Sequence, residues 1–474
     1  MKNNLFLLLG AIVALLGGCS LAPEYRRPEA PVPDGWPTGA AYSETASADA
    51  LPAAELPWRE FIADERLQQV IETALNNNRD MRLAALNVER AQALYRVQRN
   101  ELLPSVEAVG SGIKERTPAD ISSSGRATTR EQYRVDFGIS SWEIDFFGRI
   151  RSLEDRALEE YMATDQARRS MQILLISETA RAWFALAADF ENLKLSRSTL
   201  EAQQASYDLI QKRYEVGISS ELDLRQAQTQ VETARRNVAV YTQLTAQDQN
   251  ALNLLAGTPP PPELLPADLS GVQPPKEIAS GLSSEVLLYR PDVLAAEHRL
   301  KAAHANIGAA RAALFPRIAL TAAIGTASED LARLFNSGQE TWSFAPRIAA
   351  PIFDARTWAA YDVTKVEREI SVAQYEKAIQ TAFREVADAL AQRGAVGEQL
   401  AAQESLVEAT AAAYRLSDAR YNNGIDSYLN VLDAQRSLFR ARQALNDLRM
   451  IRLANRVALY KALGGGAPAD FGEK

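Results

Sequence analysis

The sequence predicts a mainly helical protein with a smaller β part, built from two structural repeats. A ten-residue stretch, Arg213–Leu222, recurs about half a chain later as Arg420–Leu429, with the same Arg-Tyr and Gly-Ile pairs. Long segments of helical periodicity flank each copy, and two segments of alternating apolar and polar residues precede them in each half. Matched copies at such a distance indicate a duplicated architecture.

The composition excludes several functional classes. The 474 residues carry a net charge of -8, which gives no basic surface for nucleic acid. Cys19 is the single cysteine, so no internal disulfide or cysteine-based metal site can form. The two histidines, His298 and His304, would point in different directions on a helix. We therefore expect no metal, no nucleic acid and no cofactor other than an N-terminal lipid. We find no phosphate loop and no catalytic cluster, and expect no enzyme.

The N-terminus predicts export and lipidation. Residues 1–18 have a basic start and a short apolar run, which predict a signal peptide rather than a membrane helix. Leu16–Cys19 resembles the lipobox of bacterial lipoproteins, which implies cleavage before Cys19 and acylation of that residue. Ser20 favours export to the outer membrane in such proteins. Residues 19–57 are rich in Pro, Ala and small polar residues, and predict an extended, lipidated tether without a core.

The first repeat is predicted to span residues 58–257. Its elements, in order, are a helix that ends at Pro104, strands at 105–113 and 133–146, a long helix over about 151–215, a turn at 216–220 and a helix to about Leu255. In the second strand the apolar set shifts phase between Ile139 and Trp142, which predicts a bulge or bend. The long helix carries apolar residues at alternating spacings of three and four, as coiled-coil seams do.

The second repeat follows a Pro-rich linker at 258–282 and is predicted to span residues 283–463. Its elements repeat the order of the first: a helix that ends at Pro316, strands at 317–325 and 341–350, a long helix, a turn at 423–427 and a helix to about Leu463. Residues 464–474 are predicted to be a C-terminal tail.

The two turns have defined end signals. Gly217 and Gly424 can adopt the left-handed conformation that ends a helix. Ser220 and Asp223 are spaced as a capping box, whereas Asp426 or Ser427 can cap the helix after the second turn. Each turn is therefore predicted to be the tip of an αα-hairpin.

The strand pairs predict a barrel that several copies share. The helices flanking a strand pair leave it on the same side, so each pair can cross a bilayer and return. A bilayer admits only helices and closed barrels, because unpaired backbone groups are costly in lipid. Four strands per chain cannot close a barrel, since single-chain barrels begin at about eight strands. Two copies would supply eight strands and three would supply twelve.

Short motifs in order along nearly the whole chain carry a family resemblance. They are Cys19–Tyr25, Trp58–Phe61, Asn78–Asp80, Trp142–Arg149, Arg290–Asp292, Gly308–Arg311 with Phe315–Pro316, Leu432–Arg436 and Tyr460–Gly465. The chain resembles the TolC/OprM family of outer-membrane factors, and its OprM-like lipoprotein branch most closely. The resemblance implies a homotrimer with a trimeric α-barrel and a shared twelve-stranded outer-membrane β-barrel. It implies a passive exit duct for drugs and other toxic small molecules, fed by a periplasmic adaptor and an inner-membrane RND pump.

The resemblance also assigns roles around the turns. It implies that the turns dock the adaptor, with the candidate residues Gly217, Ser219, Ser220, Gly424, Asp426 and Ser427. Leu429, Asp433 and Arg436 share a helix face after the second turn. They match the residues that close the periplasmic entrance in related channels. The alternative is an ordinary surface ion pair between Asp433 and Arg436, worth a few tenths of a kcal/mol.

Other functions share parts of this pattern. The same duct could carry metal ions or, in a type I system, a secreted protein. A coiled-coil structural lipoprotein without a pore would explain the long helices, but it would not explain the two strand pairs.

Overall fold

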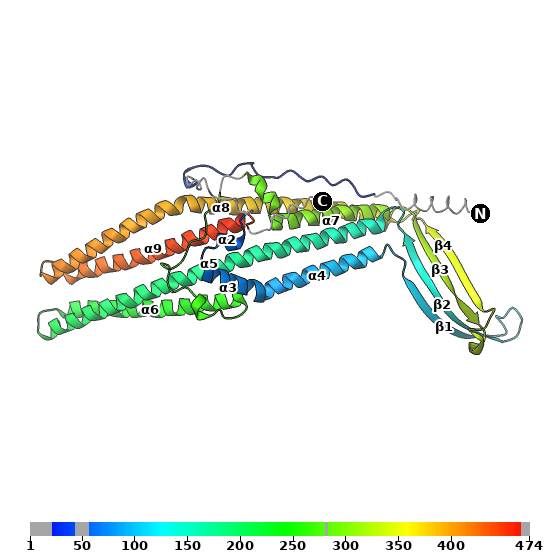
Figure 1. Ribbon diagram of the computed structural model, residues 1–474, viewed down its shortest axis with the longest axis horizontal. Helices are drawn as coiled ribbons and strands as arrows, with labels where there is room; N and C mark the ends of the chain where they lie inside the picture. The colour runs from blue at the N-terminus through cyan, green and yellow to red at the C-terminus, as the bar shows by residue number, and fades with distance from the viewer. Residues whose placement is uncertain (1–20, 43–55, 280–282, 466–474) are drawn as a thin grey trace. The chain divides into compact units, whose positions relative to one another are not determined.

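A computed structural model describes residues 21–42, 56–279 and 283–465 (Figure 1). The predicted signal peptide, Cys19 and most of the C-terminal tail lie outside these ranges. The chain divides into two compact units. One contains the chain up to residue 29 together with residues 88–164 and 296–375, and the other contains residues 30–87, 165–295 and 376–474.

The first unit contains one antiparallel sheet in the order β1-β2-β3-β4 (Figure 1). Its strands are β1 (Val106–Thr117), β2 (Thr128–Ile144), β3 (Arg317–Ser328) and β4 (Glu340–Ala349). Each predicted strand pair is a hairpin, and pairing of β2 with β3 joins the two hairpins. The outer edges of β1 and β4 have no partner strand within the described chain.

The predicted phase shift in the second strand is confirmed as a β-bulge. Between the pairs Ile139–Ala322 and Trp142–Leu320, β2 has one residue more than β3. Ser141 takes up the extra residue with a φ of 53°, and its backbone N–H donates to the Thr321 hydroxyl at 3.2 Å.

The bulge keeps the apolar residues of β2 on one face of the sheet. Directly paired residues share a face, and one face carries the cross-strand rows Phe137–Ile324–Trp342, Ile139–Ala322–Phe344 and Ile144–Ile318–Ile348. The other face carries rows such as Asp136–Gly325–Thr341 and Glu143–Ala319–Arg347. The apolar face is exposed in the isolated chain, with Trp342 80% and Ile324 68% accessible.

The β1–β2 hairpin is longer than the sequence pattern predicts. The strands were expected at 105–113 and 133–146, but β1 continues to Thr117 and β2 begins at Thr128. Opposite charges face each other across this extension, with Lys114 ion-paired to Glu131 and Glu115 opposite Arg130. Such pairs stabilise an antiparallel ladder in a segment of charged and polar residues that has no apolar alternation to indicate a strand.

The long helices form two hairpins. The first consists of α5 (Arg149–Glu215) and α6 (Glu221–Ala256), and the second of α8 (Ala355–Asn422) and α9 (Tyr428–Ala462). Shorter helices α2 (Trp58–Phe61), α3 (Glu65–Asn77), α4 (Arg79–Asn100) and α7 (Pro291–Ala312) precede the strands and long helices. Among the helices of the described ranges, none combines the length and apolar character that a membrane crossing needs.

The core of the second unit joins elements from both repeats. Trp183 on α5 is fully buried, and its indole N–H donates to the Leu264 carbonyl at 3.0 Å. Phe61 stacks on Tyr460 with ring centroids 4.0 Å apart. Arg290 forms ion pairs with Asp292 and Glu385 at 2.7 and 2.8 Å. These contacts fix the helices at the base from which the two hairpins extend.

The start of the described tether, residues 22–27, is extended and packs against α7. Glu297, whose side chain is 3% exposed, receives hydrogen bonds from Tyr25 at 3.1 Å and from Arg27 at 3.0 and 2.8 Å. A Cβ at Gly308 would lie 2.9 Å from the Ala22 Cα, so only glycine allows this close approach. Unlike a free tether, residues 22–27 are therefore held on the first unit.

Candidate functional site

The first turn joins α5 to α6 through a left-handed glycine. Gly217 has a φ of +76°, and the Ile218 N–H donates to the Arg213 carbonyl at 2.7 Å, which closes the last turn of α5. The predicted capping box is confirmed. The Asp223 N–H donates to the Ser220 hydroxyl at 3.1 Å, and the Ser220 N–H donates to the Asp223 carboxylate at 3.2 Å.

The second turn has the same backbone but a different polar closure. Gly424 has a φ of +71°, and the Ile425 N–H donates to the Arg420 carbonyl at 2.9 Å. Asp426 accepts two hydrogen bonds from the Arg420 guanidinium, at 2.6 and 3.1 Å. This bidentate pair lowers the pKa of Asp426 below its ordinary value.

The predicted side-chain cap of α9 is wrong. Ser427 occupies the N-cap position, but its side chain makes no capping hydrogen bond. Asp426 lies one residue too early to cap, and its carboxylate is bound by Arg420. The residue three positions into α9 is Asn430, whereas α6 has Asp223 there, so the second half of a capping box is missing.

A buried cluster below the turns was not predicted from the sequence. Tyr428, Val431 and Leu432 of α9 pack with Ile210 of α5 and Ala227 of α6, so one cluster joins both hairpins. Tyr428 is 4% exposed, and burial raises its pKa to about 12. Tyr414, Tyr421 and Tyr428 recur every seven residues, and this spacing was the available signal.

The three predicted gate residues lie together on an exposed face of α9, next to the buried one. Leu429 is 45% exposed, and the side chains of Asp433 and Arg436 are 61% and 47% exposed. Asp433 and Arg436 form an ion pair within the helix. The turn residues predicted to dock an adaptor lie at the tips of the hairpins, where Ile218 and Ile425 are exposed (Figure 1).

The described residues contain no evident centre for metal chemistry. Within residues 21–42, 56–279 and 283–465, no group of three or more His, Cys, Asp or Glu side chains is arranged to hold a metal ion. His298 hydrogen bonds to Glu159 at 2.6 Å, and His304 accepts a hydrogen bond from Arg368 at 3.0 Å. Both histidines therefore have structural partners.

The chain matches one protein-family model in two blocks. The model is described as "Outer membrane efflux protein", and it matches residues 70–258 and 282–465. The two blocks correspond to the two repeats and leave the Pro-rich linker between them.

Curated relatives match over almost the entire chain. Two are from Pseudomonas putida: the antibiotic efflux pump outer membrane protein ArpC and the toluene efflux pump outer membrane protein TtgC. Each is 50% identical over 460 residues, which cover 97% of this chain and 95% of the relative.

A solved structure shows the same fold. The open state of the outer membrane channel MtrE of Neisseria gonorrhoeae is 36% identical to this chain, with a TM-score of 0.85. The alignment covers 94% of this chain and 98% of the channel.

Proposed function

Because the chain belongs to the outer membrane efflux protein family, we propose that it is the exit duct of a tripartite efflux pump. It is an outer-membrane efflux component. In the proposed complex, a periplasmic adaptor docks on the two turns and an inner-membrane RND pump supplies the cargo. The duct itself is passive and has no catalytic role.

The observation that carries this proposal is the four-stranded sheet with one apolar face. The rows through Phe137 and Ile144 present aromatic and branched side chains, as a lipid-facing surface requires, whereas the rows through Asp136 and Glu143 suit a water-filled interior. The edges of β1 and β4 carry backbone groups that must be paired in lipid. A homotrimer that joins β1 of one copy to β4 of the next closes twelve strands and leaves no edge.

The names of the relatives indicate which cargo to propose. ArpC is named for antibiotic efflux and TtgC for toluene efflux, so we assign drugs and other toxic organic molecules to this duct. A non-conducting coiled-coil spacer would have no use for the apolar face of the sheet.

The entrance of the duct is closed, in this proposal, by Leu429, Asp433 and Arg436. Three copies around an axis form a ring of leucine side chains and a ring of carboxylates. The ion pair of Asp433 and Arg436 is exposed, and such a pair contributes about 0.5 kcal/mol. Because this pair lies within one helix, a tenfold shift of the closed–open equilibrium would need about 1.4 kcal/mol from contacts that these side chains make with neighbouring helices of the trimer.

Single-channel conductance in planar bilayers tests the gate. Asp433→Ala and Arg436→Ala should each raise the open probability of the purified trimer by about tenfold. The repeat offers matched controls, since Gln226 and Thr229 occupy the equivalent positions after the first turn. Gln226→Ala and Thr229→Ala should leave the conductance unchanged. Unaltered closed-state currents in both charge variants would refute a gate at this position, and failure to form any channel would refute the duct.

The N-terminal lipid is a separate part of the proposal. Cys19 would carry the acyl chains, and the contacts of Tyr25 and Arg27 with Glu297 would hold the following segment against the protein. Radiolabelled palmitate should be incorporated into the wild-type chain and not into Cys19→Ser. Equal labelling of both would exclude acylation at Cys19.

A further inference from the structure

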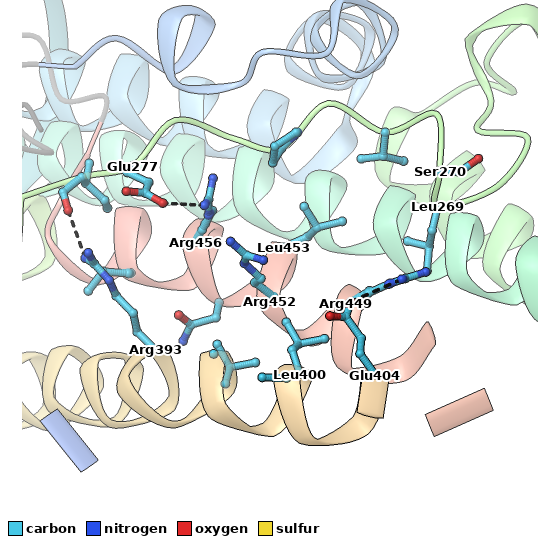
Figure 2. A pocket seen from close by; sticks show the side chains of 18 of the residues that line it. Leu269, Ser270, Glu277, Arg393, Leu400, Glu404, Arg449, Arg452, Leu453 and Arg456 are labelled. Atoms are coloured by element: carbon cyan, nitrogen blue, oxygen red, sulfur yellow. Dashed lines mark hydrogen bonds and ion pairs between the residues drawn. The ribbon is translucent and has the colours of Figure 1, made fainter. Parts of the chain in front are cut away.

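A cavity of about 540 Å³ lies between α8, α9 and the linker segment 269–278 in the second unit (Figure 2). Its size is within the range of small-molecule sites. The apolar part of its wall comes from Val396, Leu400 and Leu453, and the buried Ile278 belongs to the linker segment. None of these residues belongs to the turns or to the gate.

Four arginines from two helices line this cavity. Arg393 comes from α8, while Arg449, Arg452 and Arg456 lie on one face of α9 at spacings of three and four. Four guanidinium groups around one cavity repel each other unless anions compensate them. The cavity therefore depends on the partners that each arginine finds.

Three of the arginines have protein partners. Arg393 donates to the Ile278 carbonyl at 3.1 Å, and Arg456 pairs with Glu277 at 2.7 Å and donates to the Pro275 carbonyl at 2.6 Å. Arg449 lies 3.5 Å from Glu404, and both side chains are at least half exposed. Two of these arginines thus bind the linker segment, and the third forms a weak surface pair.

Arg452 is different. No residue in the described part of the chain forms a hydrogen bond or an ion pair with its guanidinium, which lies between Arg456 and Arg449 along the wall of the cavity (Figure 2). The cavity also contains Glu191, Glu277 and Glu404, so four positive charges face three negative ones. One positive charge remains, next to an apolar wall.

We propose that this cavity binds an organic anion, with a single acidic group on Arg452 and an apolar body against Val396, Leu400 and Leu453. A planar guanidinium presents paired N–H groups that match a carboxylate, a phosphate ester or a sulfonate. The excess of a single charge favours a monoanion. The ligand contacts α8, α9 and the linker segment together, and it therefore stabilises the base of the second hairpin. This inference does not depend on conduction through the duct.

Calorimetric titration of the purified full-length protein with 2-naphthoate tests the site. We expect saturable binding to the wild type. Arg452→Gln should weaken the affinity about tenfold to a hundredfold, which is the contribution of a charge-assisted hydrogen bond. The matched control is Arg442→Gln, on the same helix and exposed but outside the cavity, which should bind as the wild type does. Size exclusion and circular dichroism check that both variants remain folded.

Two further probes test the chemistry. Neutral 2-naphthol should bind much more weakly than 2-naphthoate because it cannot satisfy the guanidinium. Inorganic phosphate should also bind more weakly because it cannot use the apolar wall. The proposal is overturned if 2-naphthoate shows no saturable binding, if Arg452→Gln binds it as tightly as the wild type, or if phosphate or 2-naphthol binds as tightly as 2-naphthoate.

Discussion

In the first turn, the acidic residue that closes the loop is Asp223, three positions into α6, whereas in the second turn it is Asp426, one position before the N-cap of α9. The first acid caps the helix that follows. The second binds Arg420 of the helix that precedes. The equivalent arginine of the first turn, Arg213, has Ser219 in place of that acid, and its guanidinium lies 5.6 Å from the centre of the Tyr421 ring.

The residues that follow the turns differ as well. Glu221 begins α6 on the surface, while the equivalent Tyr428 begins α9 in the buried cluster. The first hairpin is therefore closed by local hydrogen bonds, and the start of the second is held mainly by tertiary packing. A helix start held by packing can be released by a shift of its neighbours, which suits the hairpin that carries the proposed gate.

The largest expected effect comes from a substitution that removes the buried packing at the start of α9. Tyr428→Ala should lower the local free energy of opening at the start of α9 by about 3 kcal/mol, the typical cost of deleting a buried aromatic side chain. Glu221→Ala, at the equivalent position, should change that of α6 by about 0.5 kcal/mol. Amide hydrogen exchange of each helix measures both values. Similar losses of opening free energy in Tyr428→Ala and Glu221→Ala would contradict the difference between the two helix starts.

Replacing the turn glycine should destabilise both turns by the same amount. Gly217→Ala and Gly424→Ala should each cost about 1 kcal/mol, because an L-residue is strained at a positive φ. Nothing lies within 4 Å of a Cβ built at either glycine, so backbone strain is the only cost. Gly397→Ala within α8 is the control, and it should stabilise the helix slightly. Amide hydrogen exchange at the two tips measures these costs. Unequal costs would mean that the two turn backbones are not equivalent.

A smaller difference in stability is expected when the N-cap serine of each helix is replaced. Ser220→Ala should destabilise the start of α6 by about 1 kcal/mol because it removes the capping box. Ser427→Ala should cost only about 0.3 kcal/mol because the Ser427 side chain makes no cap bond. Exchange rates of the first amides of α6 and α9 give the comparison. A larger cost at Ser427 would show that the serine caps α9 in solution.

The smallest effect is a pH dependence of the second turn. The lowered pKa of Asp426 means that its pair with Arg420 stabilises the turn above the ordinary carboxyl range and that this contribution is lost as the pH falls through the folded-state pKa. A spin label at Ile425 should therefore become more mobile in acid, and Asp426→Asn should show that mobility already at neutral pH. A label at Ile218 is the reference. An acid response that survives in Asp426→Asn would assign the titration to another group.

Local patterns predicted the local structure well. The Ser220–Asp223 spacing was sufficient for the capping box, and the phase shift between Ile139 and Trp142 was sufficient for the bulge. Both features depend on residues a few positions apart, whose geometry the backbone determines. The resemblance supplied the family, which the chain-wide match confirms.

Features that depend on distant partners could not be predicted. Pairing of β2 with β3 joins Phe137 to Ile324, and nothing within either hairpin specifies that neighbour. Tyr428 is buried only because Ile210 and Ala227 lie against it. Arg27 and Glu297 likewise pair across most of the chain. The predicted cap of α9 was wrong for a local reason: Ser427 makes no cap bond, and Asp426 lies one residue before the N-cap and binds Arg420.

The extra residue at Ser141 has a consequence for how β2 can change in evolution. Side chains alternate along a strand, so one inserted residue reverses the parity of everything beyond it. The bulge absorbs that reversal, because two residues of β2 stand opposite Thr321 alone. Deleting Ser141 alone would remove the bulge and leave a regular strand in which the Phe137 and Trp142 sets still lie on the same face. A single deletion should therefore be tolerated at the bulge, whereas a single deletion in the regular part of β2 would send the side chains on one side of it to the other face of the sheet.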